Sequence, residues 1–133
     1  MCIRDSIVAA LLDQDVGLDN AFSNFFGIEA AHPIALVKLG IRLDVPIASS
    51  LIYRTKEGVN EIISDEIVYS KDDPDALNKV INIYSSRVEE LIRKNPSQWV
   101  WWHKRWRRRP NIDYRANPSE LKSTNDYLSI IHI

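Results

Sequence analysis

A chain of 133 residues that is 45% hydrophobic and 26% charged has the size and composition of one small globular domain. Its formal net charge of −1 excludes a general attraction to polyanions, and its single cysteine excludes an internal disulfide. No apolar run approaches the roughly 20 residues that a membrane-spanning helix needs, and none has the form of a signal peptide.

The first residues raise the question of where the natural sequence starts. Met1–Ser6 can be read as the codons ATG TGT ATA AGA GAC AG plus one base, which resembles the end of a transposon-based sequencing adapter. We therefore expect Met1–Ser6 to be an artefact and the gene to be truncated on its 5′ side, with a natural short N-terminus as the alternative. Ile7–Leu12 then has the length of a buried strand, and Asp13-Gln14-Asp15 ends it.

The next part of the chain is predicted to form a loop, a turn and a helix. Val16–Asn24 is rich in Gly, Asp and Asn and is typical of a loop, and Phe25-Phe26-Gly27 is an aromatic pair followed by a turn residue. Pro33 fits the first turn of a helix, whose apolar residues recur at helical spacing until Asp44 and Pro46 end it.

A hairpin and a long helix are predicted after this first helix. Pro46–Tyr53 is an apolar strand rich in β-branched residues, Glu57-Gly58 is a turn, and Val59–Val68 is the partner strand. The long helix covers about Asp75–Lys94, and Asn95-Pro96 stops it. Strands and helices in this order predict an α/β protein with a mixed sheet flanked by helices.

The segment Asn95–Pro110 carries the strongest functional signal. All four tryptophans and five basic residues lie between positions 99 and 110, which leaves 12 basic and 18 acidic residues, a net of −6, elsewhere. If Ser97 caps a short helix through Trp106, two mixed faces result, made by Trp99, Trp102 and Trp106 and by Trp101, Arg105 and Arg108. Indole and guanidinium groups suit an anionic amphiphile. The alternative is that the tryptophans form core and the arginines a solvated face.

A second candidate site is Asp13-Gln14-Asp15, because ligands of α/β sheets bind beyond the carboxyl ends of strands. Its carboxylates could orient a substrate or a catalytic base, or simply begin a polar loop. His103 could hydrogen-bond a substrate or merely pack, whereas His32 and His132 suggest no site role. No metal-ligand spacing, phosphate-binding loop or nucleophile motif is present.

Three motifs in series resemble the bacterial lipid A biosynthesis acyltransferases of the lysophospholipid acyltransferase superfamily. They are Asp13-Gln14-Asp15, Phe25-Phe26-Gly27 and Asn95-Pro96-x-Gln98-Trp99-x-Trp101-x-His103-x-Arg105-Trp106. The resemblance implies that residues 7–110 are the C-terminal part of a glycerol-phosphate-acyltransferase-like α/β sandwich, with residues 111–133 as an extended tail. The family often has Pro at the position of Asn24 and Thr at that of His32, which leaves the acyl specificity open.

The resemblance also implies an activity and its partners. A fatty acyl chain would pass from acyl carrier protein, or from coenzyme A, to a hydroxyl of an anionic glycolipid at the cytoplasmic face of the inner membrane. The family's catalytic His-x4-Asp/Glu pair is absent from this sequence, so the chain is expected to be an inactive fragment without a metal or cofactor. Supporting residues would be Asp13 and Gln14, and substrate-binding residues would be Trp101, His103, Arg105 and Arg108.

Two other functions compete with an acyltransferase. A nucleic-acid-binding module would use tryptophan stacking and arginine contacts, but the net of −6 outside the segment argues against it. A non-catalytic interaction protein could use the same fold.

Overall fold

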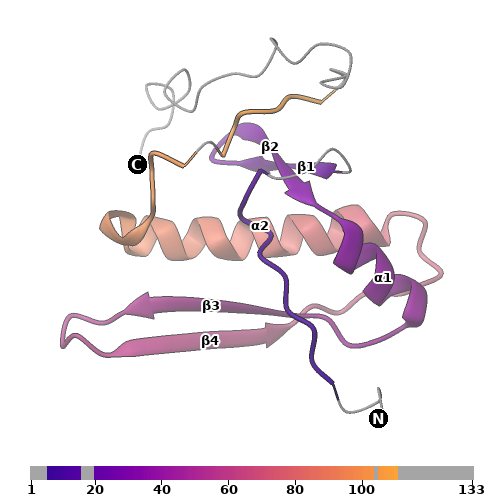
Figure 1. Cartoon of the computed structure of the whole chain (residues 1–133), viewed down its shortest axis with the longest axis horizontal. Helices are drawn as coiled ribbons and strands as arrows, with labels where there is room; N and C mark the ends of the chain where they lie inside the picture. Colours follow the sequence, from indigo (N-terminus) through magenta and orange to yellow (C-terminus); the bar gives the residue numbers. More distant parts are fainter. Residues whose placement is uncertain (1–5, 16–19, 104, 111–133) are drawn as a thin grey trace.

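The computed structural model describes residues 6–15, 20–103 and 105–110 and is built around one long helix. Helix α2 (Ala76–Lys94) lies between the hairpin β1 (Asn20–Phe25)–β2 (Ile28–Pro33) and the hairpin β3 (Ala48–Arg54)–β4 (Asn60–Glu66), as Figure 1 shows. The predicted α/β class is confirmed. The described strands form two separate antiparallel pairs, however, and not one mixed sheet.

The β1–β2 hairpin occupies part of the segment predicted to be a loop. Residues 20–24 belong to β1, so the prediction of a loop over Val16–Asn24 is wrong there, and residues 16–19 lie outside the described residues. Phe26 and Gly27 form a two-residue turn with φ values of 56° and 82°, the signature of the hairpin turn whose twist matches that of its strands. Asn24 Oδ1 accepts a hydrogen bond from the Gly27 N–H at 2.8 Å, which stabilises this turn.

Helix α1 (Ala35–Leu43) confirms the first predicted helix and its end. Its last turn closes at Asp44, which has a left-handed conformation with φ 54° and donates its N–H to the Gly40 and Ile41 carbonyls. Pro33 is the last residue of β2 and therefore precedes the helix. A side chain at Gly40 would come within 3.2 Å of Ile47, so the glycine allows the chain after α1 to pack closely.

The β3–β4 hairpin is also confirmed, with Arg54 opposite Asn60 in the register next to the turn. Arg87 of α2 holds this hairpin. Its Nη1 donates to Ser49 Oγ at 2.7 Å, and the guanidinium also donates to the backbone carbonyls of residues 65 and 66. At the other end of β3, Gln98 pairs with the backbone of Arg54: the Arg54 N–H donates to Gln98 Oε1, and Gln98 Nε2 donates to the Arg54 carbonyl, both at 2.7 Å.

Helix α2 confirms the second predicted helix and supplies both cores. Different stretches of the helix contribute to two clusters: Val88 and Ile92 belong to one, and Val80 and Ile81 belong to the other. One cluster contains Phe25, Phe26, Ala30, Val88, Ile92 and Trp106. The other contains Ile34, Val37, Ile67, Val80 and Ile81. None of the helices in the described part of the chain is both long enough and apolar enough to cross a bilayer.

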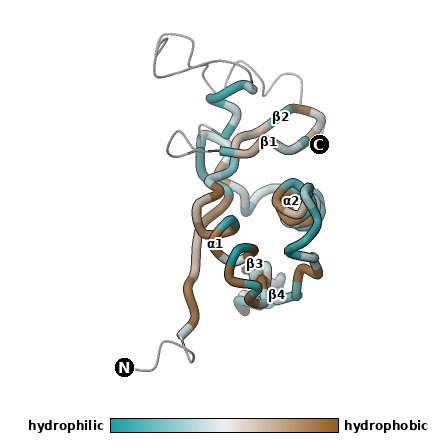
Figure 2. Tube along the Cα trace, turned by 90° about the vertical axis from the view of Figure 1, so that its right-hand side faces the viewer, coloured by the Kyte–Doolittle hydropathy of each residue, from teal (hydrophilic) through white to brown (hydrophobic). Residues whose placement is uncertain are grey.

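The segment before β1 does not form the strand predicted at Ile7–Leu12. It has no regular secondary structure, and Ile7 is 97% exposed. A buried strand needs neighbouring strands, and among the described residues none pairs with this segment. Figure 2 shows the hydrophobic residues along this segment and along α1. Apart from Ser6, the predicted adapter segment lies outside the described residues, as does the predicted tail 111–133.

Candidate functional site

The tryptophan–arginine segment is not the helix that the sequence predicted. A 3₁₀ helix, η2 (Pro96–Gln98), is followed by extended backbone at Trp99, with φ −88° and ψ 141°. Tight turns continue from there, and the Trp101 N–H donates to the Trp99 carbonyl at 3.1 Å. The predicted helix through Trp106 is therefore wrong, and its two helical faces do not exist: Trp99 packs on Phe25 and Trp101 on Phe26, whereas Trp102 is exposed.

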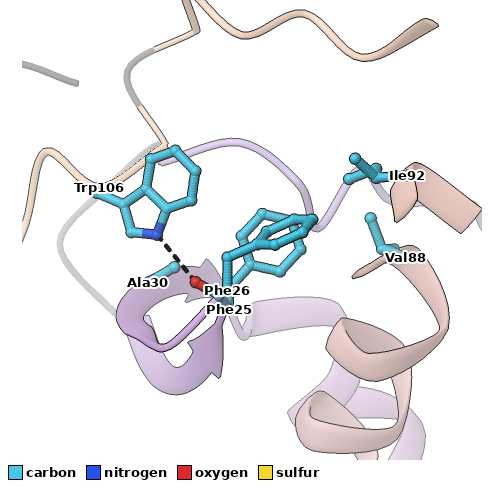
Figure 3. Close-up of a cluster of buried hydrophobic side chains, with 6 residues drawn as sticks. All are labelled: Phe25, Phe26, Ala30, Val88, Ile92 and Trp106. Carbon is cyan, nitrogen blue, oxygen red and sulfur yellow. Dashed lines mark hydrogen bonds between the residues drawn. The ribbon is translucent and has the colours of Figure 1, made fainter. Parts of the chain in front are cut away.

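Trp106 joins the segment to the β1–β2 turn. It is completely buried, its ring centroid lies 5.7 Å from that of Phe25, and its Nε1 donates to the Phe25 carbonyl at 3.3 Å (Figure 3). The ring centroids of Trp99 and Phe25 are 5.9 Å apart, and so are those of Trp101 and Phe26. The second and third sequence motifs thus form one aromatic cluster, in which Trp106 belongs to the core and Trp99 and Trp101 are partly buried against it.

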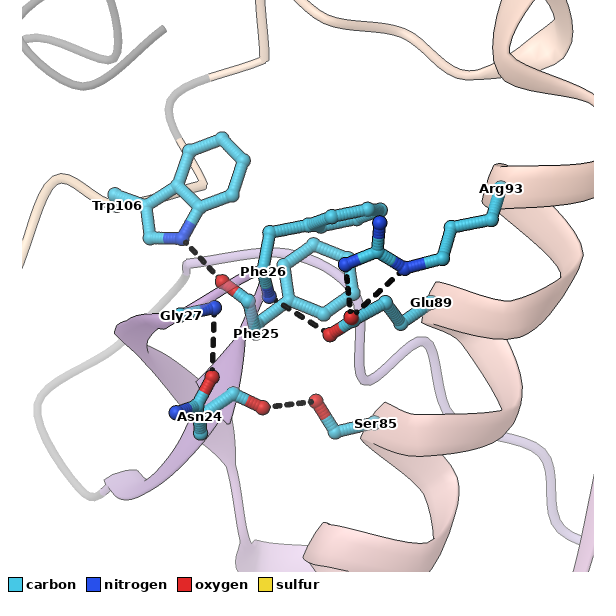
Figure 4. A network of polar contacts seen from close by, with 8 residues as sticks. All are labelled: Asn24, Phe25, Phe26, Gly27, Ser85, Glu89, Arg93 and Trp106. Carbon is cyan, nitrogen blue, oxygen red and sulfur yellow. Dashed lines mark hydrogen bonds and ion pairs between the residues drawn. The ribbon is translucent and has the colours of Figure 1, made fainter. Parts of the chain in front are cut away.

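A polar network fastens the same turn to α2 (Figure 4). The Phe26 N–H donates to Glu89 Oε2 at 2.8 Å, and Glu89 is also paired with Arg93 at 2.7 Å. The Arg93 guanidinium lies 4.8 Å from the centre of the Phe26 ring, and Ser85 Oγ donates to the Asn24 carbonyl at 3.3 Å. A non-glycine residue with positive φ is strained, and these contacts offset the strain at Phe26.

Arg105 lies inside the protein against β2. It is 1% exposed, and its Nη1 donates to the Ala31 carbonyl. Its Nη2 is 2.9 Å from Nε2 and 3.1 Å from Nδ1 of His32, which is equally buried. His32 also contacts Ser23 Oγ through Nε2 at 2.7 Å and the Leu12 carbonyl through Nδ1 at 2.9 Å. The buried Arg105 of the tryptophan–arginine segment is thus connected, through His32, to Leu12, the residue before Asp13-Gln14-Asp15.

Burial sets the charge states in this cluster. Burial, and next the positive charge of Arg105, lower the pKa of His32 to about 3, so the imidazole is neutral at pH 7. Burial lowers the pKa of Arg105 to about 10, against the opposing effects of Tyr84, Asp13 and Asp15, and the guanidinium stays charged. Burial and the nearby Asp13 raise the pKa of Tyr84 to about 12. One cation therefore faces a phenol and two acidic residues.

The carboxylates of Asp13 and Asp15 form the centre of the candidate site. Arg108 Nη1 pairs with Asp15 Oδ1 at 2.9 Å, and the Asp15 side chain is only 1% exposed. Asp13 Oδ1 and Asp15 Oδ2 are buried and accept no hydrogen bond from the described residues. Carboxylate oxygens are strong acceptors, and burial without a donor is costly. Hydroxyl groups would supply such donors. No group of three metal-ligating side chains occurs among the described residues.

The structure brings together some of the predicted site residues and separates others. Arg105 and Arg108 lie close to the Asp13 segment, whereas the Trp101 ring packs on Phe26 and its Nε1 donates to the Pro96 carbonyl at 2.8 Å. Gln14 and His103 are half-buried. The roles assigned to all six predicted residues stay predictions.

Sequence reasoning did not identify His32, Ser23 and Tyr84 as parts of the site. His32 was interpreted as a loop residue, although it stands where the family often has Thr. That departure from the family was the one sequence feature that pointed to His32. No sequence feature pointed to Ser23 or Tyr84, because their positions in the site depend on contacts between segments far apart in the sequence.

The fold and the site define an α/β protein in which two carboxylates lie close to two arginines of a tryptophan-rich segment, the buried Arg105 and the half-buried Arg108. The sequence model described as bacterial lipid A biosynthesis acyltransferase matches residues 2–108, and the chain belongs to this family. Members of the family are acyltransferases that act in lipid A biosynthesis. Searches of curated proteins and of solved structures returned no match to the chain.

Proposed function

We propose that this chain forms the acceptor-binding part of an enzyme that transfers a fatty acyl group to a hydroxyl of a lipid A-type glycolipid precursor. Acyl carrier protein, or coenzyme A, would deliver the acyl group as a thioester. The observation that carries the proposal is the pair of buried carboxylate oxygens at Asp13 and Asp15 that accept no hydrogen bond from the described residues, in a chain of this family. They suit the hydroxyl groups of a sugar, which donate hydrogen bonds.

The chemistry divides between this chain and residues outside it. The sequence contains no His-x4-Asp/Glu, so the proposal assigns the general base to a histidine outside these 133 residues. That histidine takes the proton of the acceptor hydroxyl as its oxygen attacks the thioester carbonyl carbon. A C–O bond forms, the C–S bond breaks, and the departing thiolate receives the proton. Asp13 orients the hydroxyl, and Gln14 supports the same segment.

The exposed part of the tryptophan segment supports a place at the membrane surface. Trp102 is 80% exposed, and Val100 beside it is also exposed. Indole rings favour the boundary between lipid and water. We place this surface at the cytoplasmic face of the inner membrane, where Trp101 and His103 would contact the anionic acceptor.

Binding of the acceptor tests the proposal directly on this chain. The four tryptophans between positions 99 and 106 report binding through their fluorescence, with a lipid A-type precursor in detergent micelles as the probe. Losing a hydrogen bond to a charged group costs about 1.5–3 kcal/mol, so Asp13→Asn should weaken binding roughly ten-fold or more. The control Asp72→Asn changes an exposed carboxylate of the turn before α2 and should bind like the parent. Equal affinities of the two variants would contradict the role of Asp13.

A second measurement tests the division of the chemistry. The purified chain should transfer no acyl group from acyl-acyl carrier protein or acyl-coenzyme A to the same glycolipid. Detectable transfer would show that the base lies within these 133 residues.

A further inference from the structure

The segment Leu12–Asp15 is held at both of its ends. At one end, the His32 ring contacts the Leu12 carbonyl through Nδ1 at 2.9 Å. At the other end, Arg108 pairs with the buried Asp15 carboxylate at 2.9 Å. Asp13 and Gln14 lie between these two points, so the direction of the Asp13 side chain depends on both.

We propose that His32 is a positioning residue that fixes the backbone immediately before Asp13 through the hydrogen on Nδ1, and that Arg105 holds the His32 ring in place for this. The proposal rests on the proposed function only in treating Asp13 as the group that meets the substrate. His32 and Arg105 are each 1% exposed, so the proposal gives both of them a role through other residues.

The hydrogen bonds around the ring allow only one tautomer. A carbonyl oxygen can only accept, so Nδ1 carries the hydrogen that is donated to the Leu12 carbonyl. Nε2 must then be an acceptor, and Ser23 Oγ donates to it at 2.7 Å. Arg105 Nη2 lies 2.9 Å from Nε2 and 3.1 Å from Nδ1, so the guanidinium contacts both ring nitrogens and does not select between them. The Leu12 carbonyl therefore determines where the only ring hydrogen lies.

Packing holds the plane of the ring as well as its protonation. The edge of His32 meets the ring of Tyr84 at a centroid distance of 6.2 Å and an interplanar angle of 88°. Arg105 is itself fixed by the Ala31 carbonyl in β2. His32 in β2 is therefore held in one orientation and one protonation state where it contacts Leu12. A residue that positions another must be fixed in this way.

Two substitutions of His32 separate positioning from packing. An asparagine amide reaches about as far as Nδ1, so His32→Asn can keep the donor to Leu12 while it leaves Ser23 and Arg105 without their acceptor. A glutamine amide reaches about as far as Nε2, so His32→Gln can keep that acceptor and loses the contact with Leu12. The readout is the carboxyl ¹³C NMR signal of Asp13 in the labelled 133-residue chain, measured together with the melting temperature.

We expect the Asp13 signal to shift in His32→Gln and to stay at the parent position in His32→Asn, even though His32→Asn is the less stable of the two. The control His103→Asn should leave the signal unchanged. An unmoved Asp13 signal in His32→Gln, or equal shifts in both His32 variants, would overturn the proposal.

The parent chain provides a test that needs no substitution. Long-range ¹H–¹⁵N spectra at pH 7 should show His32 as the neutral ring with hydrogen on Nδ1, and hydrogen on Nε2 would refute the proposal. These signals do not depend on glycolipid binding. Failure of the proposed function would therefore leave them as expected, and the two failures can be distinguished.

Discussion

Mild acid should destabilise this protein through His32. The pKa of the folded protein's His32 is about 3, against 6.5 for a histidine in water, so below pH 6.5 the unfolded chain binds a proton that the folded chain does not. The stability is fully present above pH 6.5 and falls as the pH drops toward 3, by about 1.4 kcal/mol per pH unit. Between pH 7 and pH 5 the loss from this group is about 2 kcal/mol. Urea unfolding followed by tryptophan fluorescence at the two pH values measures it.

Two variants assign this loss to its source. In His32→Asn, the buried group no longer titrates, and the difference between pH 7 and pH 5 should shrink by about 2 kcal/mol. His103→Gln removes a half-buried imidazole and should retain the loss, because His32 is still present. If the parent were equally stable at both pH values, or if His32→Asn showed the same loss as the parent, the account of His32 as a buried neutral base would be refuted.

Three further predictions concern the packing of the site and are tested through melting temperature and urea unfolding. Trp106→Ala should lower the free energy of unfolding by about 3–5 kcal/mol, whereas Trp102→Ala, at an exposed position, should change it by no more than about 0.5 kcal/mol. Arg108→Met leaves a buried carboxylate unpaired and should cost about 3–5 kcal/mol, much of which the added change Asp15→Asn should restore. Gly27→Ala should cost about 1–2 kcal/mol purely through the backbone, because φ is +82° and no atom lies within 4 Å of the new methyl group.

Elements with a strong apolar period were predictable from the sequence. The α1 and α2 helices and the β3–β4 hairpin follow hydrophobic spacing and turn residues, and the structure confirms all of them. The β1–β2 hairpin was missed because its strands contain Asn, Ala and Ser, which have little preference for strands. Its stability comes from the Phe26-Gly27 turn and from packing on α2, and the contacts with α2 are not local in sequence.

Some residues of the candidate site were singled out from the sequence, but their arrangement was not predicted. Sequence reasoning placed Arg105 on the surface of a helix, in reach of an acceptor's phosphate. Arg105 is buried where it donates to the Ala31 carbonyl of β2. The sequence did not predict this strand, so it could not predict the burial of Arg105. The exposed Trp102 and the buried Trp106 have the same side chain four positions apart. The buried indole is the one that packs on Phe25 and donates to its carbonyl, a contact between residues far apart in the sequence.

The pairing of Gln98 with Arg54 has a consequence for solubility. A primary amide offers one donor and one acceptor side by side, as a peptide group does, so Gln98 acts as a one-residue neighbouring strand at the end of β3. The open edge of a strand is a template on which other chains can assemble. Because Gln98 already binds the backbone N–H and carbonyl of Arg54, another chain cannot pair with β3 at this end. A residue without an amide at position 98 would open it to self-association.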